Sequence, residues 1–245
     1  GEADLAVHSL KDLPTILPDG LKLGAVGKRE DVRDVLIFRA GTFADKAPSV
    51  ENLPANATVA TSSTRRGAQL QQLRPDLTIE PIRGNVGTRL RKLSENSAIA
   101  ATVLASAGLR RLGFQISSDG TLTGEEVPAG LKAIYLSTEE MLPCVGQAAL
   151  GIEIRENDPA LEEICARLTD PDTKACAFAE RAFLREMGGG CQSPVAALAM
   201  IHNGELHLRA VSFLHKEGRR TERTGASQDA ETIGREVAAT LRDSR

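Results

Sequence analysis

A carboxylate and a lysine stand together near the start of the chain, at the end of a short apolar run. Residues 4–14 read DLAVHSLKDLP and place Asp12 beside Lys11. A carboxylate in such a turn can serve as a general acid or base. Ser9 and Asp12 also have the Ser-x-x-Asp spacing of a helix capping box, so a structural cap and a chemical role are both open here.

Three turns that combine hydroxyls, glycines and arginines follow further apolar runs. They span residues 61–66 (TSSTRR), 83–89 (RGNVGTR) and 107–113 (AGLRRLG). Backbone N–H groups at a helix start attract anions, and an arginine can hold a carboxylate by two parallel hydrogen bonds. The second turn lacks the Gly-Lys-[Ser/Thr] ending of a nucleotide-binding P-loop. The turns therefore predict a cleft for a ligand with several carboxylates, unless Arg65 and Arg66 are merely solvated helix residues.

A cysteine follows three glycines in residues 188–192 (GGGCQ). The glycines remove side-chain bulk and would let the thiol of Cys191 project into a cleft. Glycines after a helix are ordinarily a C-cap, however, and a lone cysteine is usually a small core residue. The residues alone therefore leave the role of Cys191 open.

The composition narrows the classes of partner. The net charge is -3, with no Trp, one Tyr and six Phe, which disfavours nucleic acid, because its binders need basic surfaces and stacking rings. No apolar run approaches the roughly 20 residues that span a bilayer. Four cysteines without a Cys-x-x-Cys pair favour a reducing, cytoplasmic setting. His202 and His207 flank a turn and lack the partners of a zinc site, so we expect no metal.

The apolar runs also predict the fold class. Short runs at residues 5–7, 58–60, 77–82 and 99–104 each precede a polar or glycine-containing turn and then a helical pattern. This alternation is typical of an α/β fold with a parallel sheet and crossover helices. Ligands bind beyond the carboxyl ends of such strands, which is where the turns described above would lie.

The last third of the chain predicts a smaller α+β unit. Asp170 followed by a proline marks a helix start, and Gly188 marks its end. The dipeptide at residues 203–204 is Asn-Gly, which favours a tight hairpin turn between two strands. We expect the strands at residues 195–201 and 206–213, a final helix at about 229–241, and loops or domain borders at 42–54 and 117–130.

Taken together, these motifs resemble those of the porphobilinogen deaminase family. The order and spacing of the matching segments agree, and the likeness extends over essentially the whole chain. The segments are residues 7–14, 61–66, 83–90, 142–147, 179–183 and 189–192.

The resemblance implies a hydroxymethylbilane synthase of tetrapyrrole and heme biosynthesis. Such an enzyme joins four porphobilinogen molecules head to tail, releases ammonia, and frees hydroxymethylbilane with water. By resemblance, Cys191 carries a covalent dipyrromethane primer on which the linear pyrrole chain grows, and Asp12 is the catalytic acid. The resemblance assigns carboxylate binding in the cofactor to Lys11, Ser63, Arg65, Arg66, Arg83, Gly84 and Arg89, and substrate binding to Thr61, Ser62 and Arg111.

The family architecture implies two α/β domains similar to periplasmic binding proteins and a small α+β domain. We expect domain 1 at residues 1–32 and 136–166, domain 2 at 33–135 and domain 3 at 167–245. The family normally begins with a further strand-and-helix segment, so we expect domain 1 to be incomplete and the activity of this chain to suffer. We further expect a monomer without nucleic-acid or membrane partners. A non-catalytic small-anion-binding module with a periplasmic-binding-protein-like fold is the alternative, and a cysteine-nucleophile hydrolase is more remote.

Overall fold

The computed structural model describes residues 3–190, 192–215 and 217–243. The chain forms two compact units, which we describe separately. Unit 1 comprises residues 1–30 and 143–245, and unit 2 comprises residues 31–142. The fold is mixed α/β, which confirms the fold class at that level. The division into three domains stays a prediction.

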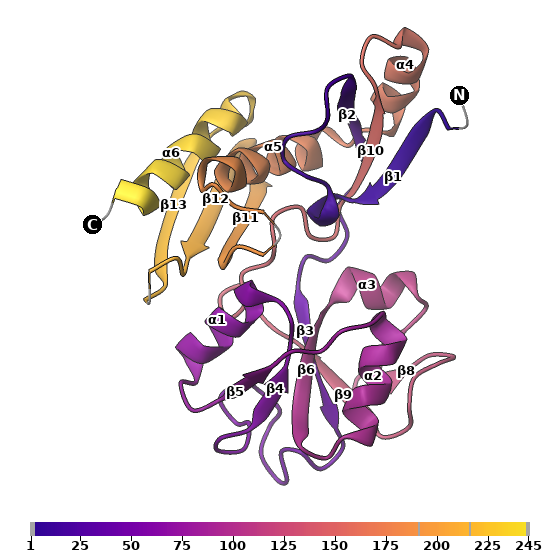
Figure 1. Ribbon diagram of the computed structural model, residues 1–245, viewed down its shortest axis with the longest axis vertical. Helices are drawn as coiled ribbons and strands as arrows, with labels where there is room; N and C mark the ends of the chain where they lie inside the picture. Colours follow the sequence, from indigo (N-terminus) through magenta and orange to yellow (C-terminus); the bar gives the residue numbers. More distant parts are fainter. Residues whose placement is uncertain (1–2, 191, 216, 244–245) are drawn as a thin grey trace. The chain divides into compact units, whose positions relative to one another are not determined.

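Unit 2 is built on a five-stranded sheet with the strand order β5-β4-β6-β3-β9 (Figure 1). β4 pairs in parallel with both β5 and β6, whereas β3 runs antiparallel to β6 and β9. The strands are β3 (Asp34–Arg39), β4 (Thr58–Ala60), β5 (Thr78–Glu80), β6 (Ile99–Ala105) and β9 (Leu131–Tyr135). The remaining elements are α1 (Thr64–Leu73), α2 (Val86–Glu95), α3 (Ser106–Arg111), and the small strands β7 (Gln115–Ile116) and β8 (Leu122–Thr123).

Both faces of this sheet are buried, as the continuous apolar run of β3 requires. Val35 and Ile37 pack with Leu90 of α2 in one core cluster. Leu36 and Phe38 point to the other face and belong to the cluster that contains Leu70 of α1. The period of two along β3 thus places α1 and α2 on opposite faces of the sheet.

Unit 1 contains two antiparallel three-stranded sheets, of orders β1-β10-β2 and β11-β12-β13. The first sheet consists of β1 (Leu5–Ser9), β10 (Leu150–Arg155) and β2 (Leu21–Val26), and the 3-10 helix η1 (Leu10–Asp12) follows β1. The second consists of β11 (Val195–His202), β12 (Glu205–Ser212) and β13 (Arg219–Ala226). The helices are α4 (Pro159–Leu168), α5 (Pro171–Glu186), α6 (Ala230–Asp243) and the short η2 (Ser227–Asp229).

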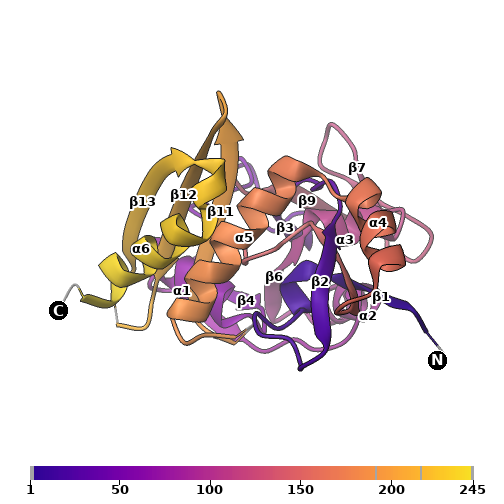
Figure 2. The ribbon, with the colours of Figure 1, turned by 90° about the horizontal axis from the view of Figure 1, so that it is seen from above.

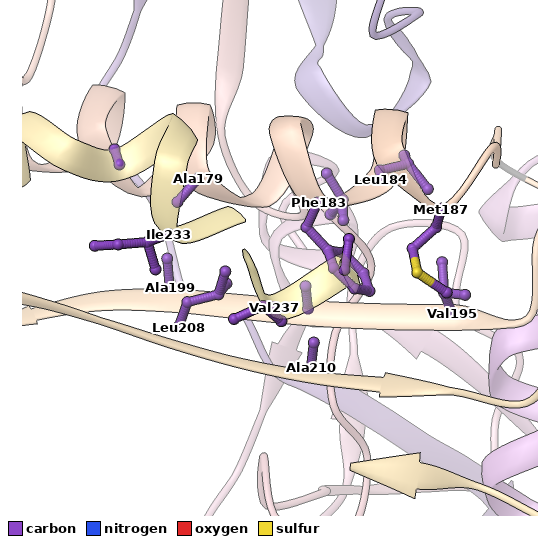
Figure 3. Packing of buried hydrophobic residues seen from close by; sticks show 14 of the residues in the cluster. Ala179, Phe183, Leu184, Met187, Val195, Ala199, Leu208, Ala210, Ile233 and Val237 are labelled. Atoms are coloured by element: carbon purple, nitrogen blue, oxygen red, sulfur yellow. The ribbon is translucent and has the colours of Figure 1, made fainter. Parts of the chain in front are cut away.

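Helices α5 and α6 lie side by side on the β11-β12-β13 sheet (Figure 2). Phe183 of α5, wholly buried, packs with Val195 and Leu208 of the sheet and Val237 of α6 (Figure 3). The side chain of Asp170 accepts a hydrogen bond from the Thr173 backbone N–H at the start of α5. This cap starts the helix where the sequence predicted it.

The hairpin prediction is also confirmed, because β11 and β12 flank Asn203 and Gly204, which have φ of 51° and 83°. One strand prediction is wrong in part. Residues 5–9 form a strand, but β1 pairs antiparallel with β10 and takes no part in the sheet of β4, β5 and β6. Local periodicity identifies a strand, whereas its partner depends on segments far away in the chain.

Candidate functional site

The arginine-bearing turns of unit 2 gather at one edge of its sheet. Because β4, β5 and β6 are parallel, the segments after them leave from the same edge. The first two turns are fastened to each other: the Thr61 backbone N–H donates to the Glu80 carbonyl at 2.7 Å, and Ser62 Oγ donates to the Ile82 carbonyl at 2.8 Å. The predicted location of these turns at one edge of the sheet is therefore correct.

Arg65 and Arg66 are buried at the start of α1, with only 4% and 6% of their surfaces exposed. Both guanidinium groups bind the wholly buried carboxylate of Asp34. Arg65 Nη1 lies 2.8 Å from Asp34 Oδ2, and Arg66 Nη2 lies 2.7 Å from Asp34 Oδ1. The interpretation of these arginines as solvated helix residues is therefore wrong.

The charge balance at Asp34 is decided by its two partners. Burial by itself would raise the pKa of Asp34, but the charges and hydrogen bonds of Arg65 and Arg66 outweigh it and hold that pKa far below its ordinary value. The carboxylate is thus ionised together with two guanidinium groups. This trio leaves one net positive charge beneath the turn at residues 61–63.

Backbone hydrogen bonds fix the same arginines from other sides. Arg65 Nη1 also donates to the Leu142 carbonyl at 2.8 Å, and Arg66 Nη1 donates to the Val103 carbonyl at 2.9 Å. Ser63 is the N-cap of α1, and its Oγ accepts from the Arg66 backbone N–H. Ser63 thus caps the helix, and the cofactor contact that the resemblance implies for it stays a prediction.

The second turn requires a glycine. Gly84 has φ of 120°, and a Cβ there would lie 2.6 Å from the Thr88 side chain. Asn85 then caps α2 by accepting from the Thr88 backbone N–H at 2.8 Å. Arg89 Nε donates to the Gly84 carbonyl at 2.8 Å, whereas the side chain of Arg83 is exposed. The turn is held in shape by its own helix.

Arg89 and Arg66 are close enough to influence each other. Burial lowers the pKa of Arg89 from its ordinary value, and the charge of Arg66 lowers it further. Positive charge is therefore concentrated where the turns after β4 and β5 meet. Arg111 lies in the last turn of α3 and is exposed.

Asp12 and Lys11 lie in unit 1, in the 3-10 turn η1 that directly follows β1. Asp12 is exposed and Lys11 is half-buried. Ser9 precedes this turn, but its side chain makes no capping hydrogen bond, so the capping-box interpretation is wrong.

Arg181 of α5 holds the turn that carries Asp12. Its guanidinium is buried and donates to the carbonyls of Leu13 and Pro14, at 3.1 and 2.6 Å. Burial lowers the pKa of Arg181, and the nearby charge of Arg185 adds to the effect. The sequence placed residues 179–183 among the matching segments but assigned Arg181 no role.

The same turn borders the glycine loop. The residues that line a small cavity of about 30 Å³ include Lys11, Leu13, Arg181, Gly189 and Gly190. Cys191 itself lies outside the described residues. The structure therefore brings the chain next to Cys191 against the turn of Lys11 and Asp12. A larger cavity of about 950 Å³, between β2, α4, α5 and η2, includes none of the predicted site residues.

Glu180, the neighbour of Arg181, organises the other side of α5. Its wholly buried carboxylate accepts from Arg29 Nη1 at 2.6 Å and from the backbone N–H groups of Gly146 and Ala199, at 2.7 and 2.8 Å. Burial by itself would lower the pKa of Arg29. The charge of Glu180 and its hydrogen bond outweigh this effect, so the pKa of Arg29 is raised. Glu180 thus ties the segment before β10 and strand β11 to one helix.

Comparisons with known proteins match this chain over nearly its whole length. The family model for the porphobilinogen deaminase dipyromethane cofactor binding domain matches residues 1–163, and the model for the C-terminal domain of the same enzyme matches residues 174–243. The chain belongs to the porphobilinogen deaminase family.

Individual relatives agree with the family models. The porphobilinogen deaminase of Syntrophobacter fumaroxidans is 44% identical over 243 residues, which are 98% of this chain and 72% of that protein. The enzyme of Geobacillus kaustophilus has the same identity and coverage. Among solved structures, an ancestral arginine-binding protein bound to arginine is 14% identical with a TM-score of 0.37, covering 71% of this chain and 67% of that one.

Family membership decides between the readings that the residues left open. The chain is a transferase of tetrapyrrole synthesis that forms hydroxymethylbilane and uses a dipyrromethane cofactor. The non-catalytic binding module is thereby set aside. No helix in the described part of the chain is long and apolar enough to cross a membrane.

The edge of unit 2 suits a cofactor of the family that carries acidic side chains. It offers the half-buried Arg89, the exposed Arg83 and the start of α2, where a helix attracts anions. Within the described residues, the buried Nε of Arg66 has no hydrogen-bond partner. A surplus of buried positive charge and a glycine-shaped turn are the features that such a ligand needs.

Proposed function

We propose that hydroxymethylbilane synthesis in this chain uses Cys191 as the covalent anchor and Asp12 as the proton-handling carboxylate. The observation that supports this assignment is the shared cavity of Lys11 and Gly190 in unit 1. The chain neighbours of Asp12 (Lys11 and Leu13) and of Cys191 (Gly190) line this same small cavity, which supports the pairing of the two residues in one site. A thioether at Cys191 resists hydrolysis, so an anchored group would survive each turnover.

Asp12 would act on the pyrrole that is being added. Loss of ammonia from the aminomethyl group of porphobilinogen leaves a cationic pyrrole, which a nearby carboxylate stabilises. After the new carbon–carbon bond forms, the same carboxylate can take the proton that the attacked α-carbon loses. When bound, the dipyrromethane supplies the first free α-carbon for this addition. Exposure of Asp12 keeps its carboxylate accessible to each successive substrate.

The cationic residues would hold the carboxylates of cofactor and substrate. Arg83, Arg89 and Lys11 present donors that can bind acetate and propionate groups. Arg65 and Arg66 add positive charge beneath the same turn and already share Asp34. For the substrate we propose Arg111 together with the hydroxyls of Thr61 and Ser62.

The assignment of Cys191 is tested by intact mass and by colour with Ehrlich's aldehyde reagent. The wild-type chain, purified from a heme-making host, should carry the added mass of a dipyrromethane and give the pyrrole colour. Cys191→Ser should show neither. Cys144→Ser is the matched control, because Cys144 is a half-buried cysteine outside the glycine loop, and it should keep both signals. An unmodified wild-type chain would contradict the assignment.

We also propose that the chain has the three-domain arrangement of its family, with two domains similar to periplasmic binding proteins. Two core clusters that each fall within one proposed domain support it: one around Ile154, in proposed domain 1, and one around Leu90, in proposed domain 2. The boundaries remain those expected from the sequence: 1–32 with 136–166, 33–135 and 167–245. A cytoplasmic location and a monomeric state, without nucleic-acid or membrane partners, stay predictions, and sedimentation of the purified chain tests the monomer.

A further inference from the structure

Asp34 occupies an unusual position for a charged side chain. It is the first residue of β3, its surface is wholly buried, and the four residues after it, 35–38, are apolar. An ionised carboxylate at such a place is stable only when cations and hydrogen bonds compensate for its burial. Arg65 and Arg66 supply both.

This carboxylate and two backbone carbonyls hold the two arginines. Each guanidinium gives one terminal nitrogen to a different oxygen of Asp34, and each also donates to a backbone carbonyl, Leu142 for Arg65 and Val103 for Arg66. The direction of both groups is therefore fixed by residues of the protein. Because the carboxylate neutralises one of two charges, a net positive charge remains at the start of α1.

That remaining charge lies at the edge where the proposed ligand carboxylates bind. The pKa of Arg89 is lowered by burial and by Arg66, which shows that the charge of Arg66 extends to the second turn. The Nε–H of Arg66 is buried and, among the described residues, donates to no acceptor of the protein. A ligand carboxylate bound at this place would compensate the positive charges of Arg66 and Arg89, and it would offer an acceptor to the Nε–H of Arg66.

A third side chain of α1 adds hydrogen bonds to the same backbone segment. Gln69 is wholly buried, donates to the Leu142 carbonyl at 3.0 Å and accepts from the Leu142 backbone N–H at 2.8 Å. Arg65 shares that carbonyl. The start of α1 is thus attached to β3 through Asp34 and to the last residue of unit 2 through Leu142.

We propose that Asp34 is a positioning residue for the family reaction: its carboxylate orients Arg65 and Arg66 toward the carboxylates of the cofactor and of the growing pyrrole chain. This inference rests on the proposed function. It differs from a purely structural role, in which Asp34 would only keep unit 2 folded. A positioning role predicts weaker binding of acidic ligands in a folded protein, with the chemical step largely preserved.

The test compares Asp34→Asn with Asp76→Asn. Asp76 also pairs with an arginine, Arg74, but this pair lies at the other end of α1 and is more exposed. Three quantities are measured for each variant: the thermal transition, the gain of dipyrromethane mass when apoprotein is incubated with porphobilinogen, and kcat and KM of loaded protein. For Asp34→Asn we expect slower loading and a KM raised by about tenfold or more, with kcat within about threefold of wild type. Asp76→Asn should match wild type in loading and KM.

The outcomes separate this inference from the proposed function. A wild-type chain that never gains the mass refutes the proposed anchor and function. A wild-type chain that loads, beside a folded Asp34→Asn variant with normal loading and KM, overturns the positioning role. If Asp34→Asn does not fold, Asp34→Glu decides, because it keeps the charge and moves it by one methylene. A folded Asp34→Glu protein with raised KM supports positioning, and one with wild-type KM and loading overturns it.

Discussion

Single side chains of this protein show how little of a charged residue's role follows from its position in the sequence. Lys11 and Asp12 were predicted together, and they share a turn, which unit 1 holds by hydrogen bonds from Arg181. Asp34 and Glu180 were not predicted as important. Each is a carboxylate that the sequence shows beside apolar residues, and only burial reveals that its charge must be compensated.

At the residue scale, we predict that Asp12→Asn abolishes elongation without unfolding the chain. Asparagine keeps the shape of the side chain but can neither carry the charge nor accept a proton as a carboxylate does. The rate of bilane formation should fall by about 10² to 10⁴, the usual contribution of a general acid or base. Asp19→Asn, an exposed acid in the loop before β2, is the control. Undiminished turnover of Asp12→Asn with an unchanged circular dichroism spectrum would assign the acid role to another residue.

Acid should reveal the contribution of Asp34 to stability. Its pKa in the folded chain is lowered from the ordinary value of 3.8, so the unfolded state binds this proton more readily than the folded state. The stabilisation is therefore complete above about pH 5 and is lost as the pH falls below that value. We expect Asp34→Asn to lower the free energy of unfolding by about 3–5 kcal/mol at neutral pH. Urea titrations should show this difference shrinking as the pH approaches about 3; a constant difference would mean that the carboxylate is not ionised in the native state.

At the scale of elements, helix starts and tight turns that specific residues mark could be predicted from the sequence. The strand with which each strand pairs could not. The beginning of α5 at Asp170 and the tight turn at Asn203 depend on neighbouring residues, and both are where the sequence placed them. Strand β13 (Arg219–Ala226) was missed, because it is mostly polar and half of it is exposed, so no apolar alternation marks it. β1 was recognised as a strand but assigned to the wrong sheet, since pairing is decided by distant residues.

The close packing of α5 and α6 yields a prediction at the same scale. A Cβ on Gly234 would lie 2.2 Å from the Ala179 carbonyl oxygen and 2.9 Å from the Ala182 Cβ. Gly234→Ala must therefore separate two helices that share the core of Figure 3. We expect a loss of about 1–3 kcal/mol in the free energy of unfolding. Gly27→Ala, in the same unit with nothing within 4 Å of its Cβ, should stay within about 0.5 kcal/mol of wild type by urea titration. Equal stability of the two variants would contradict the close approach of the helices.

At the scale of the whole molecule, the chain carries a net charge of -3 although the ligands proposed for it are acidic pyrroles. The positive charge that such ligands need is local and results from topology. Three parallel strands bring separate turns to one edge, and the buried trio of Asp34, Arg65 and Arg66 adds one charge beneath them. Composition disfavours nucleic acid as a partner, but only the sheet order could show which arginines gather.

Unit 2 is continuous in sequence, and this suggests that residues 31–142 fold without the rest of the chain. Its sheet is covered on both faces by its own core clusters, and the ion trio lies entirely within it. The Leu136 backbone N–H donates to the Asp34 carbonyl at 2.9 Å, so the segments by which the chain enters and leaves lie next to each other. A segment of this kind has the size and closure of an independent domain.

We therefore expect the isolated fragment 31–142 to show an α/β circular dichroism spectrum and a cooperative thermal transition. The matched control is the same fragment with Leu90→Ala, which empties a wholly buried position between α2 and the sheet and should cost about 2–5 kcal/mol. A fragment with a coil spectrum, or one whose transition is unaffected by Leu90→Ala, would show that unit 2 depends on residues outside 31–142. A folded fragment would mean that the arginine edge forms without unit 1, because the hydrogen bonds of the trio with Leu142 and Val103 are made inside the fragment.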